Sequence, residues 1–184
     1  MENDPRSARV NVIAVVAMSL DGKITYHDEP GNGFTSAADK KHFVECLEGF
    51  DCSVLGRTTF EASKDFILGR LSERRIRVVV TSTPEEFESL AVPGQLEFTQ
   101  HSPFEVLSNL AKRGYKNCVH LGGSDAYSSF QEARCIDEWW VSLEPRIFGE
   151  GRPLCSGVHN AHLRLLSSER LEDSDTLLLK YRVI

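Results

Sequence analysis

The feature that most constrains the fold is an alternation of short apolar strands with helical segments along the chain. The predicted strands are rich in Val, Ile and other apolar residues, and turn residues follow most of them. Apolar runs of this kind are typical of strands that are covered on both faces, as in a parallel sheet. We place these strands at 10–18, 52–55, 76–80, 96–99, 117–121 and 136–143.

Helical spacing fills the gaps between the strands. A helix is expected to begin at Ser36, because Phe43, Leu47 and Phe50 then follow at intervals of three or four residues. Gly49 marks the end of this helix. The other helices are predicted over 58–66, 104–112 and 124–133.

The C-terminal segment breaks the alternation. Two runs at 163–170 and 176–183 flank an acidic turn at 172–175, which is typical of an antiparallel hairpin. The pattern predicts a three-layer α/β fold with a mostly parallel central sheet and an antiparallel C-terminal hairpin. Since no repeat, low-complexity tract or linker interrupts the chain, we expect a single domain over residues 1–184.

Composition narrows the classes of function. With 27 acidic and 21 basic side chains the net charge is −6, which repels phosphate backbones, so we do not expect a nucleic-acid binder. Because the chain has no apolar run of membrane-spanning length and begins with polar residues, we expect a cytoplasmic protein without membrane contact. The five scattered cysteines and six histidines lack disulfide-framework or metal-ligand spacing, so no metal site is expected.

Three strand ends carry residues suited to a phosphate-bearing ligand. Ligands of parallel sheets bind at the carboxyl ends of strands, where helix N-termini offer free amides and a positive dipole end. Arg57 can add a fork of donors, and Gly123 is expected to let a diphosphate approach the backbone through a positive φ. Taken alone, each group is explained better as an ordinary strand end or helix cap. The residues are Gly56, Arg57, Thr58, Thr59, Thr81, Ser82, Gly122, Gly123 and Ser124.

The order of these segments resembles the dihydrofolate reductase superfamily, and most closely its riboflavin-biosynthesis reductase branch. The resemblance covers nearly the whole chain. It is carried by Ala-Met-Ser-Leu-Asp-Gly-Lys-Ile at 17–24, Val-Leu-Gly-Arg-Thr-Thr-Phe at 54–60, the strand and hydroxyl residues at 77–83, Gly-Gly-x-x-x-Tyr at 122–127, Ile-Asp-Glu at 136–138, Pro145, and Gly-Glu-Gly at 149–151.

This resemblance implies an NADPH-dependent reductase, commonly a homodimer, that transfers a hydride to a small heterocyclic substrate, either pterin-like or ribosylaminopyrimidine-like. It adds Ala17 to the cofactor-binding residues at the strand ends. Leu121 stands where riboflavin reductases usually carry an acidic residue before the two glycines, and this departure bears on the identity of the substrate. The alternative is a non-catalytic nucleotide- or pterin-binding module of the same fold.

Asp39 is the first candidate catalytic residue. It stands four residues before Phe43 and is expected on the apolar face of the first helix, where a carboxylate can hold a pterin-like ring. Dihydrofolate reductases place their substrate-binding acid similarly. In the alternative interpretation, Ser36 and Asp39 form a capping box at the helix N-terminus, where the acid stabilises the helix by about 0.3 to 1 kcal/mol.

Two loops supply the other expected site residues. Asp21 and Ser19, after the first strand, are assigned to catalysis, and Lys23 is assigned to substrate binding. An Asp-Gly turn with a solvated lysine is the alternative. Glu150 and Arg152, in the glycine loop near the C-terminus, are further substrate-binding candidates, and a charged surface turn is again the alternative.

Overall fold

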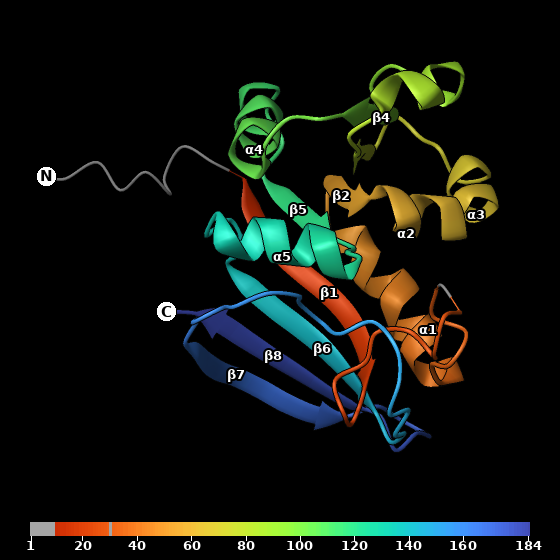
Figure 1. The fold of residues 1–184 in the computed structure, drawn as a ribbon, viewed down its shortest axis with the longest axis vertical. Helices are drawn as coiled ribbons and strands as arrows, with labels where there is room; N and C mark the ends of the chain where they lie inside the picture. The colour runs from red at the N-terminus through yellow and green to blue at the C-terminus, as the bar shows by residue number, and fades with distance from the viewer. Residues whose placement is uncertain (1–9, 30) are drawn as a thin grey trace, which may run out of the picture.

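The computed structural model describes residues 10–29 and 31–184, and its helices and strands follow the predicted order (Figure 1). The strands are β1 (Asn11–Ser19), β2 (Cys52–Gly56), β3 (Ile76–Val80), β4 (Leu96–Thr99), β5 (Asn117–His120), β6 (Glu138–Glu144), β7 (Leu163–Arg170) and β8 (Leu177–Val183). The α-helices are α1 (Ala37–Cys46), α2 (Arg57–Ala62), α3 (Lys64–Leu68), α4 (Pro103–Lys112) and α5 (Ser124–Glu132). Short 3₁₀ helices are η2 (Leu47–Gly49) and η3 (Pro84–Leu90).

The strands form an eight-stranded sheet in the order β4-β3-β2-β5-β1-β6-β8-β7. Pairing is parallel from β4 to β6, whereas β8 runs antiparallel to both β6 and β7. The predicted α/β fold with its mostly parallel sheet and antiparallel C-terminal hairpin is confirmed. The single helix predicted over 58–66 is wrong, because the backbone at Ser63 leaves the helical region and separates α2 from α3.

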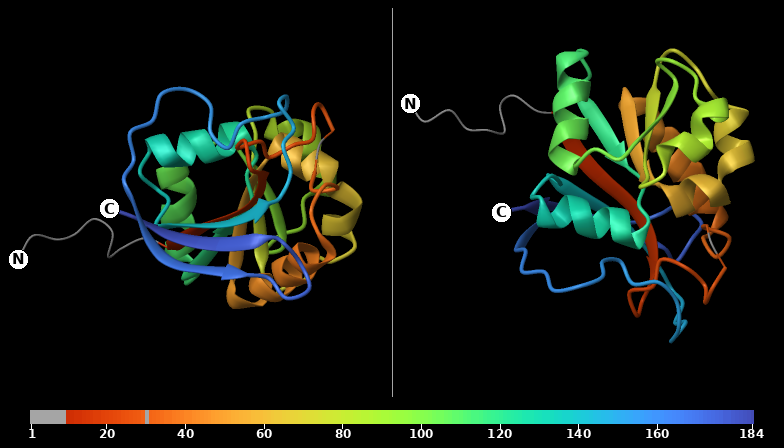
Figure 2. Two further views of the ribbon diagram at one scale, coloured as in Figure 1. Left: turned by 90° about the horizontal axis from the view of Figure 1, so that it is seen from below. Right: turned by 45° about the horizontal axis from the view of Figure 1, so that its top comes forward.

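Two layers of helices pack on opposite faces of the sheet, as the left view of Figure 2 shows. Successive side chains of a central strand point alternately to the two layers. On β1, Val12, Ala14 and Val16 belong to the core cluster that includes residues of α4 and α5. Ile13 and Val15 point to the other face and pack with the residues that follow α1. The predicted three-layer arrangement is therefore confirmed. Among the described residues, no helix is both long enough and apolar enough to cross a membrane.

The register of the parallel strands determines where the site lies. Because β3, β2 and β5 are neighbours in the sheet and run in the same direction, their carboxyl ends meet at one edge. The backbone N–H of Gly56, at the end of β2, donates a hydrogen bond of 2.6 Å to the carbonyl of Gly122, just beyond β5. Segments more than 60 residues apart in the chain are thus joined at this edge.

Candidate functional site

A cavity of about 1140 Å³ opens along this edge of the sheet. It brings together the three strand ends singled out in the sequence and adds one candidate residue from each of β1, α1 and the C-terminal glycine loop. No group of three or more His, Cys, Asp or Glu side chains within residues 10–29 and 31–184 is arranged to hold a metal ion. The candidate residues that line the cavity are Ala17, Asp39, Gly56, Arg57, Thr58, Thr59, Thr81, Ser82, Gly123, Ser124 and Arg152.

The connection from β5 to α5 is formed by Gly122 and Gly123, which are joined by a cis peptide bond. Gly122 has a φ of +76°, and a Cβ atom there would lie 2.5 Å from Cε2 of Tyr127. Gly123 instead has a φ of −77°, and its Cβ would meet only the Thr59 hydroxyl, at 3.3 Å. The expectation of a positive φ at Gly123 is therefore wrong. Gly122 meets that requirement, while Gly123 has an ordinary φ and lines the cavity close to Thr59.

The first turn of α5 lines the cavity and holds a buried polar group without a partner among the described residues. Ser124 is the first residue of the helix and is only 6% exposed, and its hydroxyl has no hydrogen-bond partner among the described residues. The N-cap residue, Gly123, has no side chain to cap the helix amides. Burying a hydroxyl without a partner costs about 1 to 3 kcal/mol, and a helix N-terminus favours an anion. This end of the cavity is therefore suited to a phosphate oxygen.

The buried imidazole of His120 holds the Gly122–Gly123 turn through hydrogen bonds. Its Nδ1 accepts a hydrogen bond of 3.0 Å from Gly122 N–H, so its Nε2 carries the proton and donates to the carbonyl of Ala126 at 3.2 Å. Complete burial of the imidazole lowers the pKa of His120 to about 4. The neutral ring therefore holds Gly122 and the first turn of α5 together at physiological pH. Its position two residues before the glycines did not reveal this role in the sequence.

Tyr127 covers the same turn. Its ring packs against His120 at a centroid distance of 4.8 Å, and its hydroxyl donates a hydrogen bond of 2.7 Å to the carbonyl of Val15 on β1. Burial raises the pKa of Tyr127 above its ordinary value, so the hydroxyl keeps its proton and remains a donor. The turn is thus enclosed between an imidazole and a phenol.

Arg57 is the first residue of α2, directly after β2, and its guanidinium is already bound by other side chains of the protein. Its Nε donates to Glu61 Oε1 at 3.0 Å, and its Nη1 donates to Thr83 Oγ1 at 2.9 Å. Glu86 Oε2 lies 3.0 Å from the same Nη1. Thr81 is internally bonded as well, since its hydroxyl accepts a hydrogen bond from Thr83 N–H.

Asp39 lies at the far end of the cavity on the first turn of α1. It is 4% exposed, and no donor among the described residues is hydrogen-bonded to its carboxylate. Ser36 caps the helix by accepting from Asp39 N–H at 3.1 Å, but Ser36 N–H donates to Glu144 Oε1 at 3.0 Å. Glu144 therefore takes the place of Asp39 as the acceptor of the reciprocal bond of a capping box, while Asp39 remains an acidic residue in the first turn of a helix capped by Ser36, as the capping alternative expects. Its buried position on the apolar face is as predicted.

Glu144 holds the N-terminus of α1 in place from the end of β6. The side chain is 3% exposed, and its second oxygen accepts a hydrogen bond of 3.0 Å from Thr176 Oγ1. The same Thr176 hydroxyl lies 2.9 Å from the Ser36 hydroxyl. These bonds join α1 to β6 and to the residue before β8, and they hold Asp39 at the cavity. The sequence did not predict this role, because the partners lie 108 and 140 residues apart.

Asp21 connects two loops and does not line the cavity. Its Oδ1 accepts from the Ser19 hydroxyl at 2.6 Å and from Phe148 N–H at 3.1 Å, and its Oδ2 accepts from Gly149 N–H at 2.7 Å. These hydrogen bonds, above all the one from Ser19, lower the pKa of Asp21 to about 2. The geometry is that of a carboxylate that holds the loop after β6 against the loop after β1.

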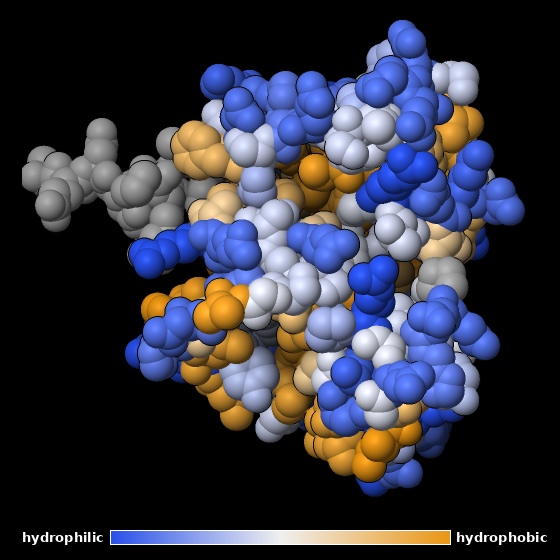
Figure 3. All heavy atoms as spheres, viewed as in Figure 1, coloured by the Kyte–Doolittle hydropathy of each residue, from blue (hydrophilic) through white to orange (hydrophobic). Residues whose placement is uncertain are grey.

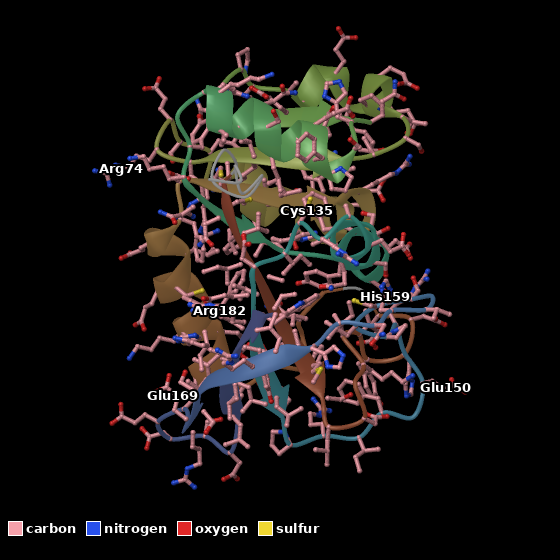
Figure 4. The ribbon with its side chains drawn as sticks, turned by 90° about the vertical axis from the view of Figure 1, so that its left-hand side faces the viewer. Arg74, Cys135, Glu150, His159, Glu169 and Arg182 are labelled. Atoms are coloured by element: carbon pink, nitrogen blue, oxygen red, sulfur yellow. The ribbon has the colours of Figure 1, made fainter. Side chains whose placement is uncertain are left out.

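The remaining loop candidates divide according to position. Ser19 is fully buried and also accepts from Lys23 N–H at 3.0 Å, while neither Lys23 nor Glu150 lines the cavity. Glu150 extends from the outer side of its loop, as Figure 4 shows. Arg152 does line the cavity. A catalytic role for Ser19 and Asp21 stays a prediction. Substrate contacts of Lys23, Glu150 and Arg152 also stay predictions, and of these three the geometry favours only the contact of Arg152.

The fold and the site define a class: an α/β protein with the architecture of the dihydrofolate reductase-like superfamily, whose strand ends converge on one cavity. Within that class, the chain belongs to the RibD C-terminal domain family, whose model matches residues 10–177. The family resemblance seen in the sequence is confirmed.

Two curated relatives come from Bacillus subtilis strain 168. The uncharacterized protein YyaP is 25% identical over 168 residues, which cover 84% of each chain. The uncharacterized protein YwjB is 24% identical over 162 residues, covering 86% of this chain and 90% of YwjB. Both comparisons extend over most of the sequence.

Solved structures share the fold. A putative riboflavin biosynthesis protein from Shewanella superposes with a TM-score of 0.72 and 21% identity over 95% of this chain and 99% of that one. A diaminohydroxyphosphoribosylaminopyrimidine deaminase/5-amino-6-(5-phosphoribosylamino)uracil reductase from Thermotoga maritima gives a TM-score of 0.76 and 21% identity. That comparison covers 97% of this chain but 58% of the Thermotoga protein. In fold, the chain thus corresponds to one part of the longer Thermotoga protein.

Proposed function

We propose that the protein is an NADPH-dependent reductase that transfers a hydride to a small heterocyclic substrate, pterin-like or ribosylaminopyrimidine-like. The observation that carries the proposal is that one cavity is lined both by Ser124, whose buried hydroxyl has no hydrogen-bond partner among the described residues, and by Asp39, a buried residue whose carboxylate accepts no hydrogen bond from them. One group suits a phosphate, and the other suits the N–H groups of a heterocycle. Membership in the RibD C-terminal domain family and the likeness to the Thermotoga reductase support the same reaction class.

The residues of the α5 end fit a dinucleotide. A Cβ atom on Gly56 would lie 3.2 Å from Cβ of Ala126 and 3.5 Å from the Gly122 carbonyl, so a larger residue here would push α5 away by a few tenths of an ångström. Gly123, Ser124 and Thr59 would hold the diphosphate, and NADPH would supply the hydride when bound. The phosphate on the adenosine would be met by the side chains at the ends of β2 and β3, which are Arg57, Thr81 and Ser82.

Asp39 orients the heterocycle in this proposal. A buried carboxylate without a donor gains a charge-assisted hydrogen bond from each ring or amino N–H that a substrate brings. Apolar side chains beside it, including Val15, Phe43 and Leu47, line the same cavity and exclude water around the bound ring. Asp39 therefore orients the bound ring and fixes the position of the N–H proton whose hydrogen bond it accepts.

The test is a panel of pterin and aminopyrimidine compounds in which oxidation of NADPH is followed by loss of absorbance. We expect turnover with one of these classes, and a decrease in kcat/KM of about 100-fold in Asp39→Asn with no loss of NADPH affinity. Glu45→Gln, on an exposed position of the same helix, is the matched control and keeps parent activity. Tight NADPH binding without oxidation of any substrate would instead support the non-catalytic module.

We also propose that the protein forms a homodimer through β7. This strand lies at the edge of the sheet, and all eight of its residues are exposed, including Leu163, Leu165 and Leu166. Figure 3 shows apolar side chains gathered over the end of the molecule that β7 and β8 form. In an antiparallel pairing of two copies centred between residues 166 and 167, Arg164 of each copy faces Glu169 of the other.

Light scattering tests this assembly. We expect a dimer for the parent, a monomer for Leu166→Lys, and a dimer for the control Leu20→Lys, which changes an exposed leucine far from β7 in the sequence. A monomeric parent, or a Leu166→Lys variant that stays dimeric, would contradict the proposed interface.

A further inference from the structure

The guanidinium of Arg57 is shared between carboxylates from two different elements. Glu61 is one turn further along α2, and Glu86 lies on η3, which follows β3. Both distances to guanidinium nitrogens are 3.0 Å. One positive charge is thus matched by two negative charges, which leaves this cluster with a formal charge of −1.

The N–H groups of Arg57 that a phosphate would bind are already bonded to other side chains. A guanidinium binds a phosphate best through two parallel N–H groups. In Arg57, Nε is bonded to Glu61, while Nη1 is shared by Glu86 and Thr83. Only Nη2 has no hydrogen-bond partner among the described residues. A phosphate that enters the cavity here has to displace a carboxylate from Arg57 or bind beside it.

The cluster is open to solvent, so its charges can be exchanged. The side chains of Arg57, Glu61 and Glu86 are 41%, 46% and 50% exposed. Ion pairs at such exposure are weak, so an incoming phosphate can break them. The ring of Phe87, whose centroid lies 5.1 Å from Cζ of Arg57, supports the guanidinium when a carboxylate leaves.

We propose that Glu61 and Glu86 determine cofactor specificity by competing with the adenosine 2′-phosphate for Arg57, and thereby hold down the preference for NADPH over NADH. The inference rests on the proposed binding of a nicotinamide dinucleotide. Glu86 has the larger effect, because it lies on a separate element and shares Nη1 with Thr83, in the segment that follows β3. NADH lacks the 2′-phosphate, so its affinity is independent of this competition.

The experiment measures dissociation constants of NADPH and NADH by fluorescence titration for the parent, Glu86→Gln, Glu61→Gln and the double variant. We expect Glu86→Gln to bind NADPH about fivefold more tightly and NADH unchanged, with a smaller gain for Glu61→Gln. The gain should shrink as the salt concentration is raised toward about 0.5 M, because exposed charges are screened. Arg57→Ala should abolish the difference between the two cofactors.

Glu88→Gln is the matched control, since Glu88 is also on η3 and forms no ion pair in the described part of the chain. Thermal unfolding confirms that each variant is folded. An NADPH/NADH ratio in Glu86→Gln equal to that of the parent and of Glu88→Gln would overturn the inference while leaving the proposed function intact. Weaker NADPH binding in Glu86→Gln would also overturn it. A parent that binds neither cofactor would contradict the proposed function itself.

Discussion

The two phosphate-suited ends of the cavity satisfy their polar groups in opposite ways. At the α5 end, the helix amides have no side-chain cap and the Ser124 hydroxyl has no partner among the described residues. At the Arg57 end, two carboxylates and a threonine already bind the guanidinium. A ligand at the first end completes hydrogen bonds that the protein leaves open, whereas at the second end it replaces bonds that exist. In the proposed function, the first end determines whether a dinucleotide binds, and the second determines which one binds.

The largest effect on this comparison is expected for Gly122→Ala. A Cβ atom there would overlap Tyr127 at 2.5 Å, and the residue would have to keep a φ of +76°. Overpacking and a left-handed backbone together cost about 3 kcal/mol. We expect a corresponding loss in the free energy of unfolding, measured in urea, together with loss of cofactor binding. Gly94→Ala, at a φ of +73° with open space around it, is the control for the backbone contribution alone.

The α5 end is also expected to be sensitive to acid through His120. Its pKa of about 4 in the folded protein is below the ordinary value of 6.5, so the unfolded chain binds more protons between these values. Stability from the neutral ring is therefore complete above pH 6.5 and is lost as the pH falls toward 4. The loss is about 3 kcal/mol. Urea unfolding at a series of pH values should show this slope in the parent and not in His120→Gln. Equal slopes would contradict the assignment of the neutral imidazole.

A smaller effect is expected for Ser124→Ala, which removes the unpartnered hydroxyl. Without a ligand the variant should be as stable as the parent or more stable, because a buried group without a hydrogen bond is lost. NADPH and NADH should both bind about fivefold more weakly, since one hydrogen bond to the diphosphate is missing. Ser108→Ala on α4 serves as the control. A weaker affinity for NADPH alone would place the 2′-phosphate, not the diphosphate, at Ser124.

The fold and the convergence of the strand ends could be predicted because they depend on local patterns. Runs such as 76–80 are apolar and β-branched, and parallel strands place their carboxyl ends at one edge. The burial of Asp39 also followed from its spacing to Phe43 on a helix face. These features need only the period of a helix or a strand and the direction of a sheet.

The partners of the site residues could not be predicted, because they come from distant parts of the chain. Glu144 caps α1 across 108 residues, and Glu86 reaches Arg57 from an unpredicted 3₁₀ helix. The Asp21 carboxylate was assigned to catalysis because of the motif around it, but its hydrogen bonds to residues 148 and 149 depend on the packing of two loops. Local sequence shows which groups are available and does not show which of them are already satisfied.

The most direct test of a dinucleotide at the α5 end is the affinity of Gly123→Val for NADPH. Gly123 has an ordinary φ of −77°, and the one close contact of an added Cβ, 3.3 Å from the Thr59 hydroxyl, is relieved by a small shift of that side chain, so the variant should fold. Its methyl groups would occupy the space beside Ser124 that the diphosphate needs. We expect NADPH affinity to fall at least tenfold while the melting temperature stays within a few degrees of the parent. A folded Gly123→Val variant with parent affinity for NADPH would contradict a cofactor site at this turn.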